Sequence, residues 1–128
     1  MALDGVFLYN LMNKLKPVFL DAKIDKINQP EKDEIIITLR KDRKNHKLLI
    51  SSSSSFPRIH FTEITKENPL KAPMFLMVLR KYILGGKIVN VSQINGDRIV
   101  VLEIEASDEM GFNSLYSLII EIMEGILI

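Results

Sequence analysis

The sequence contains no cysteine and only two histidines, His46 and His60. The lack of cysteine excludes disulfide bonds, thiolate catalysis and cysteine-based zinc sites, and it fits a reducing compartment. Two histidines without clustered carboxylates predict neither a metal site nor a cofactor. No apolar run approaches the roughly 20 residues that a membrane helix needs, and the N-terminus does not resemble a secretory signal. We therefore expect a cytoplasmic protein with no membrane partner.

No lysine or arginine follows Arg98. Residues 1–98 hold all 17 basic residues against 10 acidic ones, whereas residues 99–128 hold six acidic residues, so the net charge of +1 conceals an asymmetry. Basic clusters attract phosphate backbones without reading sequence, although a solvated hairpin turn would have the same composition. The densest basic stretch comprises Arg40, Lys41, Arg43, Lys44 and Lys47.

Two helices are predicted. The first begins after Asp4, whose carboxylate suits an N-cap, and it should end or kink at Pro17 near Lys16. The second begins at Pro73 and stops at the double glycine 85–86. Its run of apolar residues predicts burial on most sides, with its methionines as core fillers.

The rest of the pattern is typical of β-strands, because short runs of β-branched and apolar residues alternate with turn-forming residues. Residues 41–46 form a predicted basic turn, residues 51–55 a serine-rich surface loop, and Asn95-Gly96 a two-residue hairpin turn. The predicted strands are 23–29, 34–40, 47–51, 58–61, 87–93, 98–105, 115–123 and 126–128.

The sum is an α+β protein with two helices and about eight short strands, in a chain that has the length of one domain. We predict a single domain over residues 1–128, built as an antiparallel β-sandwich or flattened barrel with the helices on its ends or edges. The apolar strand 126–128 would favour pairing with another copy and a dimer in a crystal.

A series of short motifs is spread over residues 2–123. The motifs are ALDG at 2–5, KINQP at 26–30, KLLIS at 47–51, RIHFT at 58–62, NP at 68–69, PMFLMVLRK at 73–81, GG at 85–86, DRIV at 97–100 and EIM at 121–123. In this order they resemble the NFACT-N domain, the N-terminal domain of the ribosome quality-control proteins called RqcH in bacteria and NEMF in animals. Bacterial members are often labelled fibronectin-binding protein A.

The resemblance implies a fold similar to the N-terminal domain of formamidopyrimidine-DNA glycosylases. It also implies binding to the large ribosomal subunit that carries a stalled peptidyl-tRNA, binding of a charged tRNA (alanyl-tRNA in bacteria), and support of C-terminal alanine tailing. Peptidyl transfer belongs to the ribosome, so the resemblance does not imply an enzyme.

Family functional residues map onto Asp4 and onto the pair Asp97-Arg98. Arg98 is suited to a bidentate phosphate contact or to stacking on an unpaired base, and Asp97 to orienting Arg98 or accepting from a base edge. From the residues alone, Asp4 as a helix cap and Asp97-Arg98 as a surface pair stay open. Two further sets are a weaker family match at Glu121, Ile122 and Met123, and candidate RNA backbone contacts at Arg40, Lys41, Arg43 and Lys44.

The chain departs from the family in two ways. Glu124-Gly125 stands where the family has a Gly-Arg-His-Ser-Asn-like segment, so the resemblance does not carry an RNA contact by that loop over to this chain. The difference reflects either natural divergence or a shortened chain. Family members are also several-fold longer, so we expect an N-terminal piece of a longer protein.

Three other functions agree less well with the residues. A fibronectin-binding surface adhesin is the alternative, although the chain has neither a signal peptide nor a wall-anchoring segment. A glycosylase-like repair enzyme is disfavoured because Ala2 stands where those enzymes use an N-terminal proline amine, and fold alone does not carry activity. A serine hydrolase is disfavoured because no Gly-x-Ser-x-Gly motif is present.

Overall fold

The computed structural model describes residues 13–14, 16–51, 58–63, 71–94, 99–121 and 125–127. In these ranges eight strands form one antiparallel sheet with the order β4-β3-β2-β1-β5-β6-β7-β8, which confirms the predicted fold class. The elements are β1 (Lys23–Glu31), β2 (Glu34–Lys41), β3 (Lys44–Ser51), β4 (Arg58–Thr62), α2 (Met74–Ile83), β5 (Lys87–Gln93), β6 (Ile99–Ser107), β7 (Asn113–Glu121) and β8 (Gly125–Leu127).

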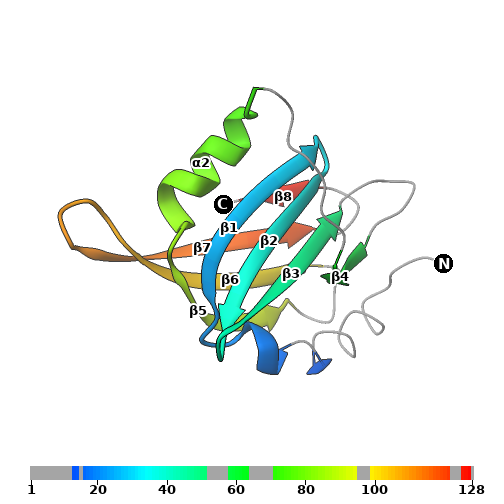
Figure 1. The fold of residues 1–128 in the computed structure, drawn as a ribbon, viewed down its shortest axis with the longest axis horizontal. Coiled ribbons are helices and arrows are strands. Elements are labelled where there is room, and N and C mark those ends of the chain that lie inside the picture. Colours follow the sequence, from blue (N-terminus) through cyan, green and yellow to red (C-terminus); the bar gives the residue numbers. More distant parts are fainter. Residues whose placement is uncertain are drawn as a thin grey trace.

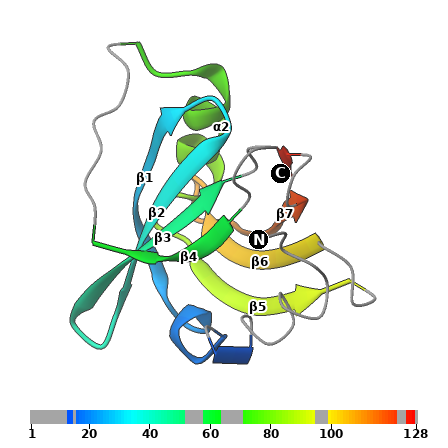
Figure 2. The ribbon, with the colours of Figure 1, turned by 90° about the vertical axis from the view of Figure 1, so that its right-hand side faces the viewer.

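The sheet consists of two four-stranded halves that meet at a short junction. β1 and β5 share a single register pair, Lys23 with Lys87. Four backbone hydrogen bonds flank this pair: Gly85 N to Ile24 O and Ile24 N to Gly86 O, each 2.8 Å long, and Asp21 N to Ile88 O and Ile88 N to Ala22 O, each 2.9 Å long. Because so few residues pair there, the halves can fold over one another, and Figures 1 and 2 show β1–β4 and β5–β8 on two sides with α2 at one end.

The hydrophobic core lies between the two halves. Fully buried aliphatic side chains come from both of them, such as Ile37 and Leu48 from the first half and Leu102 and Ile120 from the second. Alternate residues of β6 are buried, as expected of a strand with one face on the core. Burial of each such side chain contributes about 1.5–3 kcal/mol, so this core holds the curved sheet together.

Helix α2 packs on the core by one stripe only. Leu76, Leu79 and Ile83 are fully buried and follow helical spacing. In contrast, Met74 is 75% exposed and Met77 is 54% exposed. The prediction that the helix is buried on most sides, with methionines filling the core, is therefore wrong, because the helix covers an end of the sheet and turns its other face outward.

Arg80 ties α2 to the free edge of β1. Its Nε and Nη2 atoms both donate to the carbonyl oxygen of Ile27, at 3.3 and 3.0 Å. β5 pairs with β1 only near the start of β1. The carbonyl oxygen of Ile27 lies beyond that pairing, and the side chain of Arg80 supplies hydrogen bonds to it.

Replacing Arg80 by methionine keeps most of the side-chain volume but removes both donors. We expect Arg80→Met to lower the free energy of unfolding by about 1–3 kcal/mol, because a part-buried carbonyl loses its partner. Urea unfolding followed by circular dichroism measures this. Lys81→Met, at the exposed neighbouring position, should change stability by less than about 0.5 kcal/mol; equal effects of the two substitutions would contradict the assigned role of Arg80.

Several predicted boundaries change in the structure. Helical residues 16–19 continue through Pro17, since Leu20 N still donates to Lys16 O at 3.0 Å; the helix therefore does not end near Lys16. β1 runs through Pro30 to Glu31. The loop predicted at 107–114 shortens to residues 108–112, because β6 and β7 pair as far as Ser107 and Asn113.

The β6–β7 hairpin extends beyond β5, whose last partner on β6 is Glu105, and it projects from the body (Figure 1). The carboxylate of Asp108 accepts from the backbone N–H groups of Met110 and Phe112, at 2.9 and 3.0 Å. These bonds hold the turn in one shape.

Some predictions fall outside the described residues. They include the start of the first helix at Asp4, most of the serine loop, the Asn95-Gly96 turn and the motif residues Ile122 and Met123. Within the described part of the chain, no helix is long and apolar enough to span a membrane.

Candidate nucleic-acid interface

The residues onto which family functional residues map lie outside the part of the chain that the structure describes. These are Asp4, Asp97 and Arg98. The positions of the two residues that flank the connection 95–98 are nevertheless known, because Ile94 N donates to Ile99 O at 3.0 Å. Ile99 is also the register partner of Glu121. The fold thus brings the start of the EIM motif next to the strand that follows Asp97-Arg98.

The basic turn, defined here as Arg40, Lys41, Arg43 and Lys44, is fully described. β2 and β3 pair up to Lys41 and Lys44, so the connection has only two residues, Asp42 and Arg43. Both have positive φ angles, 52° and 66°, which is the backbone of a tight hairpin turn that matches strand twist. The predicted six-residue turn 41–46 is therefore too long, and residues 44–46 belong to β3.

The four basic side chains divide into two pairs. Arg40 Nη1 donates to Asn45 Oδ1 at 3.1 Å, and Lys41 Nζ donates to the carbonyl oxygen of Pro17 at 2.6 Å. The first bond lies within the hairpin, between register partners, and the second binds the hairpin to the segment before β1. Arg43 and Lys44 are exposed at the tip of the hairpin. The tip residues are therefore better placed to meet an external phosphate than the two residues before them.

The basic turn and the strand ends that flank the connection 95–98 do not lie together. Figure 2 shows the β2–β3 turn on one side of the molecule and the adjoining ends of β5 and β6 on the other. An RNA that touches both regions must span the molecule, so each region can be tested separately.

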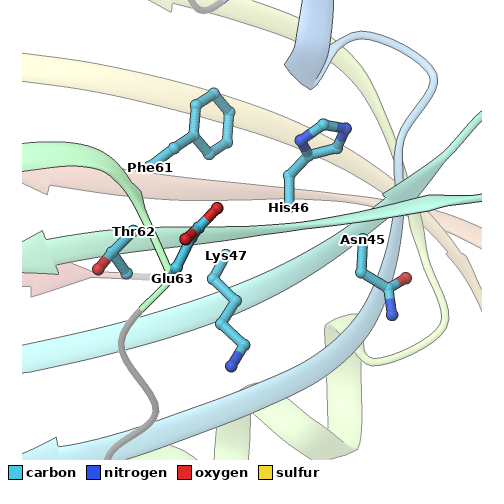
Figure 3. Close-up of a pocket in the computed structure, with 6 residues that line it drawn as sticks. All are labelled: Asn45, His46, Lys47, Phe61, Thr62 and Glu63. Atoms are coloured by element: carbon cyan, nitrogen blue, oxygen red, sulfur yellow. The ribbon is translucent and has the colours of Figure 1, made fainter.

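An open pocket of about 460 Å³ lies beside the basic turn. β4 ends at Thr62, opposite Lys47, whereas β3 continues three residues further, paired among the described residues with β2 alone. This step in the sheet edge creates the pocket. It is lined by Asn45, His46, Lys47, Phe61, Thr62 and Glu63 (Figure 3).

The pocket has two different sides. Because side chains alternate along a strand, His46 and Phe61 point to one side of β3, and Glu63 points the same way in Figure 3. Asn45 and Lys47 point to the other side. Sequence reasoning missed this grouping, although Lys47, Phe61 and Thr62 fall in the KLLIS and RIHFT motifs, because their meeting depends on the register of β3 with β4.

The side chains of the described region include few groups suited to a metal ion. No group of three or more histidine, aspartate or glutamate side chains suited to a metal ion occurs among the described residues. What the structure offers is a cationic turn beside paired rings, an amide and a carboxylate.

The chain is similar to known proteins in sequence and in structure. Residues 4–125 match the family described as NFACT N-terminal and middle domains. The Rqc2 homolog RqcH of Streptococcus pneumoniae serotype 2 is 40% identical over 123 residues, which are 96% of this chain and 22% of that protein. The Rqc2 homolog RqcH of Bacillus subtilis gives the same identity and coverage. The N-terminal domain of the fibronectin-binding protein PavA from Streptococcus pneumoniae superposes with a TM-score of 0.90 at 40% identity, covering 94% of this chain and 45% of that one.

Fold and surface together define an antiparallel α+β domain with a cationic hairpin on its rim. The chain belongs to the NFACT-N family, as its match over residues 4–125 and its identity to the RqcH proteins show. The resemblance stated from the motifs is confirmed. The chain spans 22% of the length of the RqcH proteins it matches.

Proposed function

We propose that this domain is a tRNA- and ribosome-binding module of a ribosome-associated quality-control factor in the cytoplasm. Its partners are the large ribosomal subunit with a stalled peptidyl-tRNA and an alanyl-tRNA. The domain supports alanine tailing of the stalled chain by binding and positioning RNA. It is not itself an enzyme and needs no cofactor, because the ribosome carries out peptidyl transfer.

One observation carries the proposal. Arg43 and Lys44 stand exposed at a tight turn, in a chain that belongs to the same family as the RqcH proteins. A guanidinium and an ammonium on a short hairpin can meet neighbouring phosphates without a further cost of ordering the backbone, and only their side chains lose rotamer freedom. Such contacts provide affinity that does not depend on base sequence.

The pair Asp97-Arg98 is tested by tRNA binding to the isolated domain. We expect Asp97→Ala/Arg98→Ala to weaken binding about tenfold or more, because hydrogen bonds to charged groups contribute about 1.5–3 kcal/mol each. Fluorescence anisotropy with labelled tRNA at two salt concentrations measures the change.

A matched control is available on β1, where the exposed neighbours Asp25 and Lys26 form another acid–base pair. Asp25→Ala/Lys26→Ala leaves the net charge unchanged, as the first variant does, and should leave affinity unchanged. Equal affinity of all three proteins would remove Asp97-Arg98 from the site. Absence of binding by folded wild-type domain would refute the proposal for the isolated domain.

A second candidate function is fibronectin binding, favoured by the name of the solved neighbour from Streptococcus pneumoniae. It requires saturable binding of the purified domain to immobilised fibronectin. If Arg43→Glu/Lys44→Glu abolished such binding and the folded wild-type domain bound no tRNA, the adhesin function would replace the RNA function.

A further inference from the structure

The rings of His46 and Phe61 form a supported aromatic wall. Their centroids lie 5.7 Å apart with an interplanar angle of 54°. Phe61 in turn contacts Phe19, with centroids 5.6 Å apart, and Phe19 is fully buried in the core. Because Phe61 packs against the buried ring of Phe19, the two half-buried rings are held in position at the pocket. A flat ring that enters the pocket would meet aromatic surface already in position.

Glu63 adds a hydrogen-bond acceptor on the same side. It follows Phe61 by two residues, so strand alternation directs it with the ring, and Figure 3 shows its carboxylate on the side of the two rings. Its side chain is exposed. An ionised carboxylate only accepts hydrogen bonds, so a ligand in this pocket must offer donors on its edge.

The charges around the pocket disfavour a basic peptide as its ligand. An aromatic wall with a carboxylate is also suited to a lysine or arginine side chain from a partner protein. The neighbouring hairpin, however, carries Arg40, Lys41, Arg43, Lys44 and Lys47 against Asp42. This surplus of positive charge repels a basic peptide and attracts a polyanion. A polyanion with flat rings and donor edges is a nucleic acid.

We propose that the His46–Phe61–Glu63 pocket holds one unpaired nucleobase of an RNA whose phosphates lie along the basic turn. The inference deepens the proposed RNA-binding function and rests on it. The base contacts the two rings, which is how proteins hold splayed-out bases of single-stranded RNA. Guanine fits best, because its Watson–Crick edge presents the N1–H and N2–H groups side by side to a carboxylate, whereas uracil presents one N–H there.

The direct test is NMR titration of the wild-type chain with GMP, AMP, CMP and UMP, with ribose 5-phosphate as the probe that lacks a base. We expect the ring signals of His46 and Phe61 to shift with the nucleotides, most tightly with GMP, and to stay in place with ribose 5-phosphate. Equal shifts with ribose 5-phosphate would show that the phosphate alone binds, and would overturn the proposal.

Two variants extend the test to tRNA. His46→Ala should weaken tRNA binding about fivefold or more, since stacking of one base on an aromatic side chain has effects of this size. His60→Ala is the matched control, because His60 lies on the opposite face of β4 from Phe61 and only its Nδ1 atom meets the Phe61 carbonyl oxygen, at 2.9 Å.

Glu63→Gln separates base recognition from net charge. Removal of one negative charge alone should strengthen tRNA binding slightly, as we expect for Glu109→Gln at another exposed position. The mononucleotide titration supplies the second readout. If Glu63 accepts from guanine, Glu63→Gln should abolish the preference for GMP over AMP. A GMP preference that survives Glu63→Gln would contradict the role of Glu63.

The outcomes distinguish this inference from the proposed function. If tRNA binds and neither His46→Ala nor Glu63→Gln has an effect, the pocket proposal fails and the RNA-binding function stands. If tRNA does not bind at all, the proposed function fails, and the mononucleotide titration decides the pocket separately. Ring shifts caused by an arginine-rich peptide and not by GMP would assign the pocket to a protein partner and overturn the proposal.

Discussion

Charge reversal at the hairpin tip, by Arg43→Glu/Lys44→Glu, is expected to lower the affinity of the domain for tRNA about tenfold to a hundredfold at low salt. Both side chains are exposed, so the substitutions would remove the two proposed phosphate contacts and place two negative charges against the RNA backbone. The hairpin should keep its fold, because neither side chain belongs to the core. Fluorescence anisotropy with labelled tRNA over a range of salt concentrations measures the loss.

The salt dependence is the sharper readout. A phosphate contact releases counterions, so each lost contact should reduce the slope of log K against log salt by about one. Lys71→Glu/Lys81→Glu makes the same change in net charge at exposed positions before and near the end of α2. If this control lowers the affinity and the slope equally, binding responds to net charge alone and the basic turn is not a site.

Enlarging Gly86 is expected to cause the greatest loss of stability. A Cβ atom at this position would lie 2.7 Å from Ile104 Cγ2, 3.0 Å from Ile83 O and 3.1 Å from Glu105 O. Gly86 sits at the junction of the two half-sheets, where its carbonyl oxygen accepts from Ile24 N. Two of the three obstacles are backbone atoms and cannot rotate away. We expect Gly86→Ala to cost about 1–3 kcal/mol and Gly86→Leu more, as measured by urea unfolding.

Gly85 is the matched control for this prediction. Its φ of +83° makes any side chain unfavourable, yet no atom lies within 4 Å of a Cβ built there. Gly85→Ala should therefore cost about 1–2 kcal/mol through backbone strain, and Gly85→Leu about the same. A size dependence at Gly86 and none at Gly85 is the expected pattern. A Gly86→Leu variant as stable as Gly86→Ala would show that the junction relaxes easily.

The secondary structure was largely predictable because local pattern and tertiary environment agree. β2 is a run of β-branched residues at Glu34–Lys41 and forms a strand. Helix α2 begins at Met74, one residue after the predicted start at Pro73, which is its N-cap. Where prediction erred, a non-local contact decided: nothing in the local sequence told which face of α2 would meet the core, and so the exposure of Met74 and Met77 was missed.

The sequence by itself determined the class of fold, the family and the position of the basic turn, because each depends on local composition, strand periodicity or motif order. The tertiary structure alone decided two things. One is that Arg43 and Lys44 stand at the tip while Arg40 and Lys41 are engaged with Asn45 and the Pro17 carbonyl. The other is the pocket, whose His46 and Phe61 lie on different strands: the rings meet because β3 pairs with β4 in one register and β4 stops at Thr62, and register is set by packing between strands.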